Sequence, residues 1–165
     1  MSIKFSVKMN EKYMYDFFLC NIYSKISGIS MLILGGIALA MSIRTWITSS
    51  FTMAMPTMIV AVLFLVVNPM NTKSSAKMQV KNTPMFQKPL DYELNETGII
   101  IRQDDAEATN RWEDIAKVVS TRKSIIVYMN RVRALIMPRE CMGEQCDAVI
   151  EMIRTHVPAK KVRIK

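Results

Sequence analysis

Two long runs of apolar residues dominate the pattern of hydrophobic and polar positions along the chain. Residues 26–43 carry no charged side chain, residues 45–72 carry none either, and Arg44 alone separates the two runs. Each run is close to the ~20 apolar residues that an α-helix needs to cross a bilayer, and tilt or local thinning accommodates the difference. The pattern therefore predicts a transmembrane helical hairpin over residues 26–69, with a short external turn between Arg44 and Ser50.

Outside these runs, the hydrophobic residues recur with the spacings of β-strands and of amphipathic helices, which is typical of a small mixed domain. Residues 2–8 alternate between polar and apolar and predict a strand, while residues 11–24 have the spacing of an amphipathic helix. From residue 90 onward, strand-like runs are separated by turn residues, which is typical of antiparallel meanders. These runs are 90–94, 98–102, 117–121, 124–129 and 132–137.

The period changes again at Pro138, a residue that suits the first position of a helix. Apolar residues then follow at helical spacing as far as Pro158: Cys141, Met142, Cys146, Val149, Ile150 and Ile153. A lone antiparallel sheet has one face to bury, and a terminal amphipathic helix covers it. The predicted fold class is an α+β membrane protein: a two-helix transmembrane hairpin plus a small antiparallel β-sheet domain closed by a C-terminal helix.

Four regions follow from this pattern. They are an N-terminal strand and amphipathic helix (1–25), the transmembrane hairpin (26–69), a basic linker (70–89) and a cytosolic domain (90–165). The sequence Ala38-Leu39-Ala40 resembles the cleavage site of a signal peptide. A signal peptide has a short basic leader, however, whereas 25 residues that include two acids precede this apolar run, so we expect no cleavage.

The net charge of +8 is unevenly distributed and predicts the orientation of the hairpin. Residues 73–88 contain four lysines and no acid, whereas residues 91–165 are nearly balanced, with thirteen basic and twelve acidic side chains. Basic residues are retained on the cytoplasmic side, so we expect a plasma-membrane protein with both termini in the cytoplasm. The nearly neutral folded part argues against a nucleic-acid partner.

Three of these lysines, Lys73, Lys77 and Lys81, are four positions apart. If the second helix continues past Asn68-Pro69, they lie on one face at the level of the inner headgroups. Each would contribute about 1 kcal/mol of attraction to anionic lipid. They are therefore candidate lipid contacts, and the alternative is that they act only as a topology signal.

Small residues recur seven positions apart in both predicted spans and are candidates for the contact between the two helices, because they let backbones approach closely. They are Gly28, Gly35 and Ser42 in the first span and Ala54 and Ala61 in the second. The alternative is that glycine and alanine are simply common in membrane helices. Gly36 and Ala40 are a further pair of small residues, four positions apart, on a neighbouring face of the first span. This face could contact a second hairpin in a homodimer.

The spans contain no Asp, Glu, Lys or His, which argues against a stand-alone transporter. The thioethers of Met53, Met55 and Met58 could hold Cu(I), although methionine is more often adaptable apolar filler. We therefore expect no metal and no cofactor.

Little in the sequence suggests catalysis. Cys141 and Cys146 lack the second ligand pair of a zinc site, and with Cys20 they fall in or beside regions assigned to the reducing cytosol, where disulfides are rare. His156 is the single histidine, and no nucleotide-binding, serine-hydrolase or zinc-protease motif is present. We expect no catalytic residues and no enzyme activity.

Several short motifs follow the two predicted spans: Asp91-Tyr92-Glu93-Leu94, Gly98-Ile99, Trp112-Glu113-Asp114-Ile115, Tyr128 and Ile136-Met137-Pro138-Arg139. With these motifs, nearly the whole chain resembles the YcxB-like proteins of Gram-positive bacteria. The resemblance implies a pleckstrin-homology-like (PH-like) soluble domain, a curved and mostly antiparallel sheet closed by a C-terminal helix, with no known active site. Arg139 replaces the lysine common in that family and keeps its charge. Trp112 and Tyr128 are better interpreted as packing residues than as a binding site.

Two functions of different classes remain open from the sequence. The first is a membrane-anchored interaction or regulatory module that contacts a protein partner or anionic inner-leaflet lipids. The second is a self-protection (immunity) or exporter-accessory protein that acts against membrane-active peptides. The identity of the partner and the oligomeric state also stay open.

Overall fold

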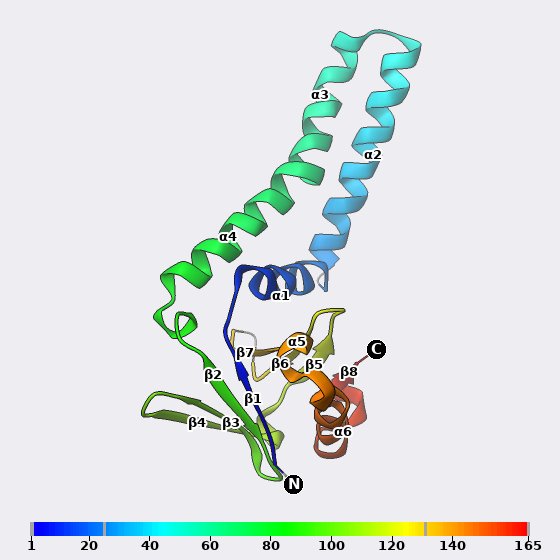
Figure 1. Cartoon of the computed structure of the whole chain (residues 1–165). Coiled ribbons are helices and arrows are strands. Elements are labelled where there is room, and N and C mark those ends of the chain that lie inside the picture. The colour runs from blue at the N-terminus through cyan, green and yellow to red at the C-terminus, as the bar shows by residue number, and fades with distance from the viewer. Residues whose placement is uncertain (1, 25, 131, 165) are drawn as a thin grey trace. The chain divides into compact units, whose positions relative to one another are not determined.

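The computed structural model describes residues 2–24, 26–130 and 132–164 and has an α+β fold (Figure 1). Residues 1 and 25, which bound the predicted N-terminal region, and residue 165, which ends the predicted cytosolic domain, lie outside these ranges. The chain divides into two compact units. The β unit comprises the residues up to Phe17 and those from Met78 onward, and the hairpin unit comprises Phe18–Lys77.

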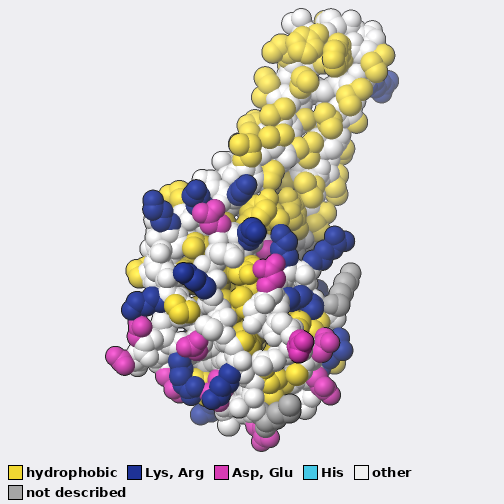
Figure 2. Space-filling view, viewed as in Figure 1, with side chains coloured by type: hydrophobic (Ala, Val, Ile, Leu, Met, Phe, Trp, Pro, Cys, Tyr) yellow, Lys and Arg dark blue, Asp and Glu magenta, His cyan; other side chains and the backbone are white. Residues whose placement is uncertain are grey.

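The hairpin unit consists of α2 (Ile26–Thr48), α3 (Phe51–Val62) and the adjoining parts of α1 (Glu11–Tyr23) and α4 (Asn68–Asn82). A π-helical turn, Leu63–Val67, joins α3 to α4 without a break. By length and composition, α2 and this continuous second helix are each able to cross a membrane. Apolar side chains cover much of their visible surface in Figure 2, and many are exposed.

The π-helical turn lies immediately before Pro69. Proline has no backbone N–H, and its ring crowds the carbonyl group four residues earlier, which here belongs to Leu65. A wider helical turn at this point accommodates the proline, so the helix continues into α4. The second helix thus extends past Asn68-Pro69 to Asn82.

The first sheet of the β unit is antiparallel and has the strand order β1-β2-β3-β4. Its strands are β1 (Ile3–Val7), β2 (Leu90–Leu94), β3 (Gly98–Gln103) and β4 (Ala106–Arg111). The N-terminal strand therefore pairs with a strand that follows the whole hairpin, from Ile3 opposite Leu94 to Val7 opposite Leu90.

The second sheet has the order β7-β6-β5-β8. It contains β5 (Lys117–Ser120), β6 (Ser124–Tyr128), β7 (Ala134–Pro138) and the short β8 (Val162–Arg163), which runs parallel to β5. The prediction of a single antiparallel sheet is therefore wrong. The 3-10 turn Trp112–Asp114 lies between β4 and β5, and the chain passes there from the first sheet to the second.

The C-terminal helix is interrupted, contrary to the continuous helix predicted from Pro138. A short α5 (Arg139–Met142) is followed by a 3-10 turn (Gly143–Gln145) and then by α6 (Cys146–His156). Gly143 ends α5 with φ +52° and ψ −128°, a combination that glycine adopts far more easily than any residue with a side chain.

The core of the β unit contains residues from both sheets and from α6, whose Val149 and Ile153 are fully buried. The opposite face of the second sheet is also apolar, since Ile126 and Ile136 are buried outside that core cluster. The first turns of α1 contact this sheet through Asp16 and Phe17, and α1 starts where the Asn10 side chain accepts a hydrogen bond from the Tyr13 N–H (2.9 Å).

Candidate functional site

An apolar cavity of about 380 Å³ lies between the edge strands of the two sheets of the β unit. β4 is the last strand of the first sheet, and β7 is the edge strand of the second. Both contribute three consecutive residues to its wall, 106–108 and 134–136. The remaining lining residues are Met9, Met85, Phe86, Leu90, Tyr92, Ile101, Gln103 and Arg133.

Within the described chain, β4 pairs only with β3 and β7 pairs only with β6, so each has one edge that no other strand covers. Residues 106–108 are exposed. The outer edge of β4 is therefore exposed beside an apolar cavity, whereas β7 is buried from Leu135 to Pro138.

Tyr92 forms part of the cavity wall and is 3% exposed. Its ring stacks on that of Phe5, with centroids 5.4 Å apart. Burial raises the pKa of Tyr92 well above its ordinary value, so the group stays a neutral hydrogen-bond donor.

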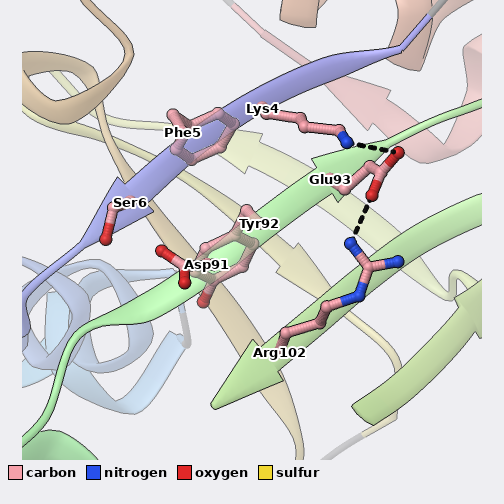
Figure 3. Close-up of a pocket in the computed structure, with 7 residues that line it drawn as sticks. All are labelled: Lys4, Phe5, Ser6, Asp91, Tyr92, Glu93 and Arg102. Atoms are coloured by element: carbon pink, nitrogen blue, oxygen red, sulfur yellow. Dashed lines mark hydrogen bonds and ion pairs between the residues drawn. The ribbon is translucent and has the colours of Figure 1, made fainter. Parts of the chain in front are cut away.

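A second hollow lies on the first sheet and is lined by residues of β1, β2 and β3, among them the charged side chains of Lys4, Asp91, Glu93 and Arg102 (Figure 3). Glu93 is 3.5 Å from Lys4 and 2.5 Å from Arg102, and Arg102 reaches Glu107 at 2.8 Å. The hydrogen bond from Arg102 is the main reason why the pKa of Glu93 is lowered. The charged lining residues are two cations, Lys4 and Arg102, and two anions, Asp91 and Glu93, so the lining carries no net charge.

The first turns of α1 are tied to the β unit by two polar contacts. The Tyr13 hydroxyl donates to Glu140 (2.7 Å), and the Thr121 hydroxyl donates to Asp16 (2.5 Å). The hydrogen bond to Glu140, followed by burial, raises the pKa of Tyr13 to about 12. No local sequence pattern predicts these contacts, because the partners are more than 100 positions apart.

Replacing Tyr13 by phenylalanine is expected to lower the free energy of unfolding by about 1–2 kcal/mol, because Glu140 loses its donor. The folded pKa lies above the unfolded value near 10, so the tyrosine's contribution is complete below pH 10 and is lost as the pH rises toward 12. Denaturant unfolding at pH 8 and pH 11 should therefore show a smaller pH effect in Y13F. An equal loss in the control Tyr15→Phe would contradict this assignment.

The structure places four of the five predicted small residues at the contact between the two long helices. Ala54 and Ala61 are 2% and 1% exposed, and the Ser42 hydroxyl lies 3.2 Å from the Ala54 carbonyl. Gly35 faces Leu65, whose side chain would crowd a Cβ atom there. Gly28 does not belong to this contact, since it packs against the backbone of Ile22 where α1 gives way to α2.

Two further residues of this contact were not predicted. Thr57 lies 2.8 Å from the Ser42 hydroxyl, and Ala38 is 9% exposed. Gly36, predicted for a dimer face, has open space around it.

The other candidates of the helical segments are on α3 and α4. Lys73, Lys77 and Lys81 are exposed and share one face of α4 at their four-residue spacing. Met55 and Met58 line a shallow apolar groove on α3, whereas Met53 is two positions from Met55 and thus projects from nearly the opposite side of the helix. The three thioethers therefore do not converge on one ion.

Trp112 packs in the core, as predicted, and is 5% exposed. Its ring stacks on His156 at 5.1 Å, and its indole N–H donates to the Asn95 carbonyl (2.9 Å). Tyr128 is half-buried and lies against Phe17. Arg139 donates to the sulfur of Cys146 (3.5 Å).

Cys141 and Cys146 are not joined by a disulfide. Within the described ranges, no group of three or more His, Cys, Asp or Glu side chains is arranged to hold a metal ion.

Comparison with known families supports the resemblance seen in the sequence. Residues 94–153 match the family model of YcxB-like proteins, a segment that runs from the end of β2 into α6 and includes Trp112, Tyr128 and Arg139. The match does not include the two apolar helices. No curated protein matches the chain.

Proposed function

We propose that the protein is a membrane-anchored interaction module, in which α2 and the continuous α3–α4 helix cross the plasma membrane and the cytoplasmic β unit binds a partner. The pairing of β1 with β2 carries this proposal. β1 precedes the hairpin and β2 follows it, yet the two strands are hydrogen-bonded from Ile3–Leu94 to Val7–Leu90. Since one sheet cannot lie on both sides of a bilayer, the two flanks of the hairpin share one side.

The charge distribution supports the cytoplasm as that side. The helix α4 carries Lys73, Lys77 and Lys81 directly after the apolar part of the second helix, whereas Arg44 is the single basic residue between residues 26 and 72. Basic residues near the ends of spans are retained in the cytoplasm.

A PH-like arrangement is the fold that we propose for the β unit. Two four-stranded sheets share one core, and α6 supplies the buried Val149 and Ile153 to it. The match of residues 94–153 to YcxB-like proteins supports the same interpretation.

Reporter fusions and extraction test the anchor. We expect cytoplasmic reporters to be active at both termini, an external reporter to be active near Thr48, and the protein to stay in the membrane fraction at alkaline pH. Reporters active on opposite sides at the two termini, or release of the protein by carbonate, would refute the proposed anchor.

The three lysines of α4 are proposed to contact anionic lipid. A peptide spanning residues 71–90 is expected to bind anionic vesicles and to ignore neutral ones, because each lysine adds about 1 kcal/mol of attraction, or roughly 3 kcal/mol before salt screening. Replacing Lys73, Lys77 and Lys81 by glutamine should abolish binding, which a sedimentation assay at two salt concentrations measures.

A matched control is a peptide in which Lys88 alone becomes glutamine, since Lys88 pairs with Asp104 in the structure (2.5 Å). It should retain most of the binding. Equal binding to both kinds of vesicle would reduce the lysines to a topology signal.

Deletion of the gene separates the interaction role from the self-protection role. An interaction module should leave the sensitivity of the cell to membrane-active peptides unchanged. Increased sensitivity on deletion, restored by the intact gene, would favour the self-protection or exporter-accessory role instead.

A further inference from the structure

We propose that a groove between α1 and α4 binds the hydroxyl-bearing headgroup of a membrane lipid, a glycerol or a sugar. The groove lies within the hairpin unit and has a volume of about 310 Å³. This volume is at the lower end of the range of ligand pockets, ~300–1,000 Å³, and suits a headgroup rather than a whole lipid. The inference rests on the proposed membrane anchor and gives it a lipid of defined chemistry.

The two walls of the groove are regular helical faces. On both helices the lining residues are three or four positions apart, the spacing of side chains that share one face. They are Asn68, Asn71, Thr72 and Ser75 on α4 and Phe18, Asn21 and Ile22 on α1. The site is therefore built on helices, which hold their side chains more precisely than loops do.

Both walls are joined to the ends of the apolar helices. Asn68 begins α4 directly after the π-helical turn Leu63–Val67, the last wholly apolar segment of the second helix. On the other wall, Gly28 of α2 lies against the backbone of Ile22 so closely that a Cβ atom would not fit. In a membrane-spanning hairpin, the groove therefore lies at the level where the hydrocarbon core gives way to the lipid headgroups.

The polar side chains of the groove match hydroxyl groups. None of the seven lining residues is charged. The carboxamides of Asn21, Asn68 and Asn71 each offer N–H donors and a carbonyl acceptor. The Thr72 hydroxyl donates to the Asn68 main-chain carbonyl (2.9 Å), so its lone pairs remain to accept a hydrogen bond. A ligand hydroxyl both donates and accepts, and a glycerol or a sugar presents several hydroxyls close together.

The same lining disfavours other headgroup chemistries. A bare phosphate is bound by Lys or Arg, and an ammonium group by carboxylates or a cage of aromatic rings. Lys73 is two positions from both Asn71 and Ser75, and Lys77 is two positions from Ser75, so both lysines project from the other side of α4. Phe18 is the single aromatic residue among those that line the groove. Hydrogen bonding to hydroxyl groups, and not charge, should therefore decide which lipid binds.

Competition between lipids that differ in their hydroxyl groups tests this inference. The full chain is purified in detergent, and two pairs of lipids with the same acyl chains are added, each pair in equal amounts. The pairs are phosphatidylglycerol with phosphatidylpropanol, which have the same charge, and glucosyl diacylglycerol with diacylglycerol. Native mass spectrometry measures which lipid stays bound. We expect the hydroxylated lipid of at least one pair to be retained about tenfold more, the effect of one or two additional hydrogen bonds. Preference in one pair alone identifies the glycerol or the sugar as the ligand.

Ser74 and Ser75 provide a matched pair of substitutions, since both are exposed and, of the two, only Ser75 lines the groove. Ser75→Leu fills the groove and should abolish the preference, whereas Ser74→Leu should retain it. The variant with Lys73, Lys77 and Lys81 replaced by glutamine should also retain it, because charge does not decide the binding.

Equal retention within both lipid pairs, an equal effect of the two leucine variants, or loss of the preference in the glutamine variant would overturn the inference. The assay is made in detergent and does not depend on membrane topology. A protein that stays in the membrane at alkaline pH but shows no lipid preference would therefore refute this inference and leave the proposed anchor intact.

Discussion

Replacing Trp112 by alanine is expected to lower the free energy of unfolding of the β unit by about 3–5 kcal/mol, the usual effect of removing a buried aromatic side chain. Trp112 is 5% exposed, stacks on His156 and donates its indole N–H to the Asn95 carbonyl. It therefore connects the β2–β3 turn to the end of α6. Denaturant unfolding of the full chain in detergent, followed by protease resistance of the β unit, measures the loss.

The variant Trp112→Phe separates the packing contribution from that of the hydrogen bond. It keeps an aromatic ring against His156 but leaves the Asn95 carbonyl without its donor, so a smaller loss of roughly 1–3 kcal/mol is expected. Wild-type stability of Trp112→Ala would show instead that this ring is dispensable for folding and would make a binding role for it more credible.

Deleting residues 2–8 is expected to unfold most of the β unit, although these residues precede the hairpin. The deletion removes β1 with its buried Ile3 and Val7, and it exposes β2. Burial of an aliphatic side chain contributes about 1.5–3 kcal/mol, so the two together contribute roughly 3–6 kcal/mol, comparable to the ~5–15 kcal/mol total stability of a domain. Loss of a protease-resistant fragment from residue 78 onward would confirm the expectation.

Two point variants of β1 make the same test without shortening the chain. Val7 is fully buried, whereas its neighbour Ser6 is exposed on the other face of the strand. Val7→Asp should therefore destabilise the β unit strongly, and Ser6→Asp should be nearly neutral. Similar stability of the two variants would mean that β1 contributes little to the fold.

Hydrophobic alternation predicted most of the strands but neither β4 nor the two-residue β8. The runs at 90–94 and 124–129 coincide with β2 and β6 within one residue, because at least one face of each strand is buried. β4 has the sequence AEATNR, and five of its six residues are exposed. An edge strand beside a cavity has no buried face to select apolar residues, so the sequence carries no periodic signal for it.

The candidate site was predictable only in part. The spacing of Lys73, Lys77 and Lys81 and of the small residues is local, so a helical reading of the sequence was enough to find both sets. The cavity combines Met9, Met85, Tyr92 and Leu135, which come from distant segments and are unremarkable one by one. Its existence depends on how two sheets meet, and that is a long-range property of the fold.

The pairing of β1 with β2 sets an order of events during synthesis. About 80 residues separate the paired Val7 and Leu90, so a ribosome working at ~5–20 residues per second needs several seconds to complete the sheet. During that interval the nascent N-terminal strand has no β2 to pair with, while the two apolar helices between β1 and β2 are already being synthesised. Slow emergence of β2 from the ribosome would prolong this interval. We expect a chaperone that shields extended chains to bind the growing protein during it.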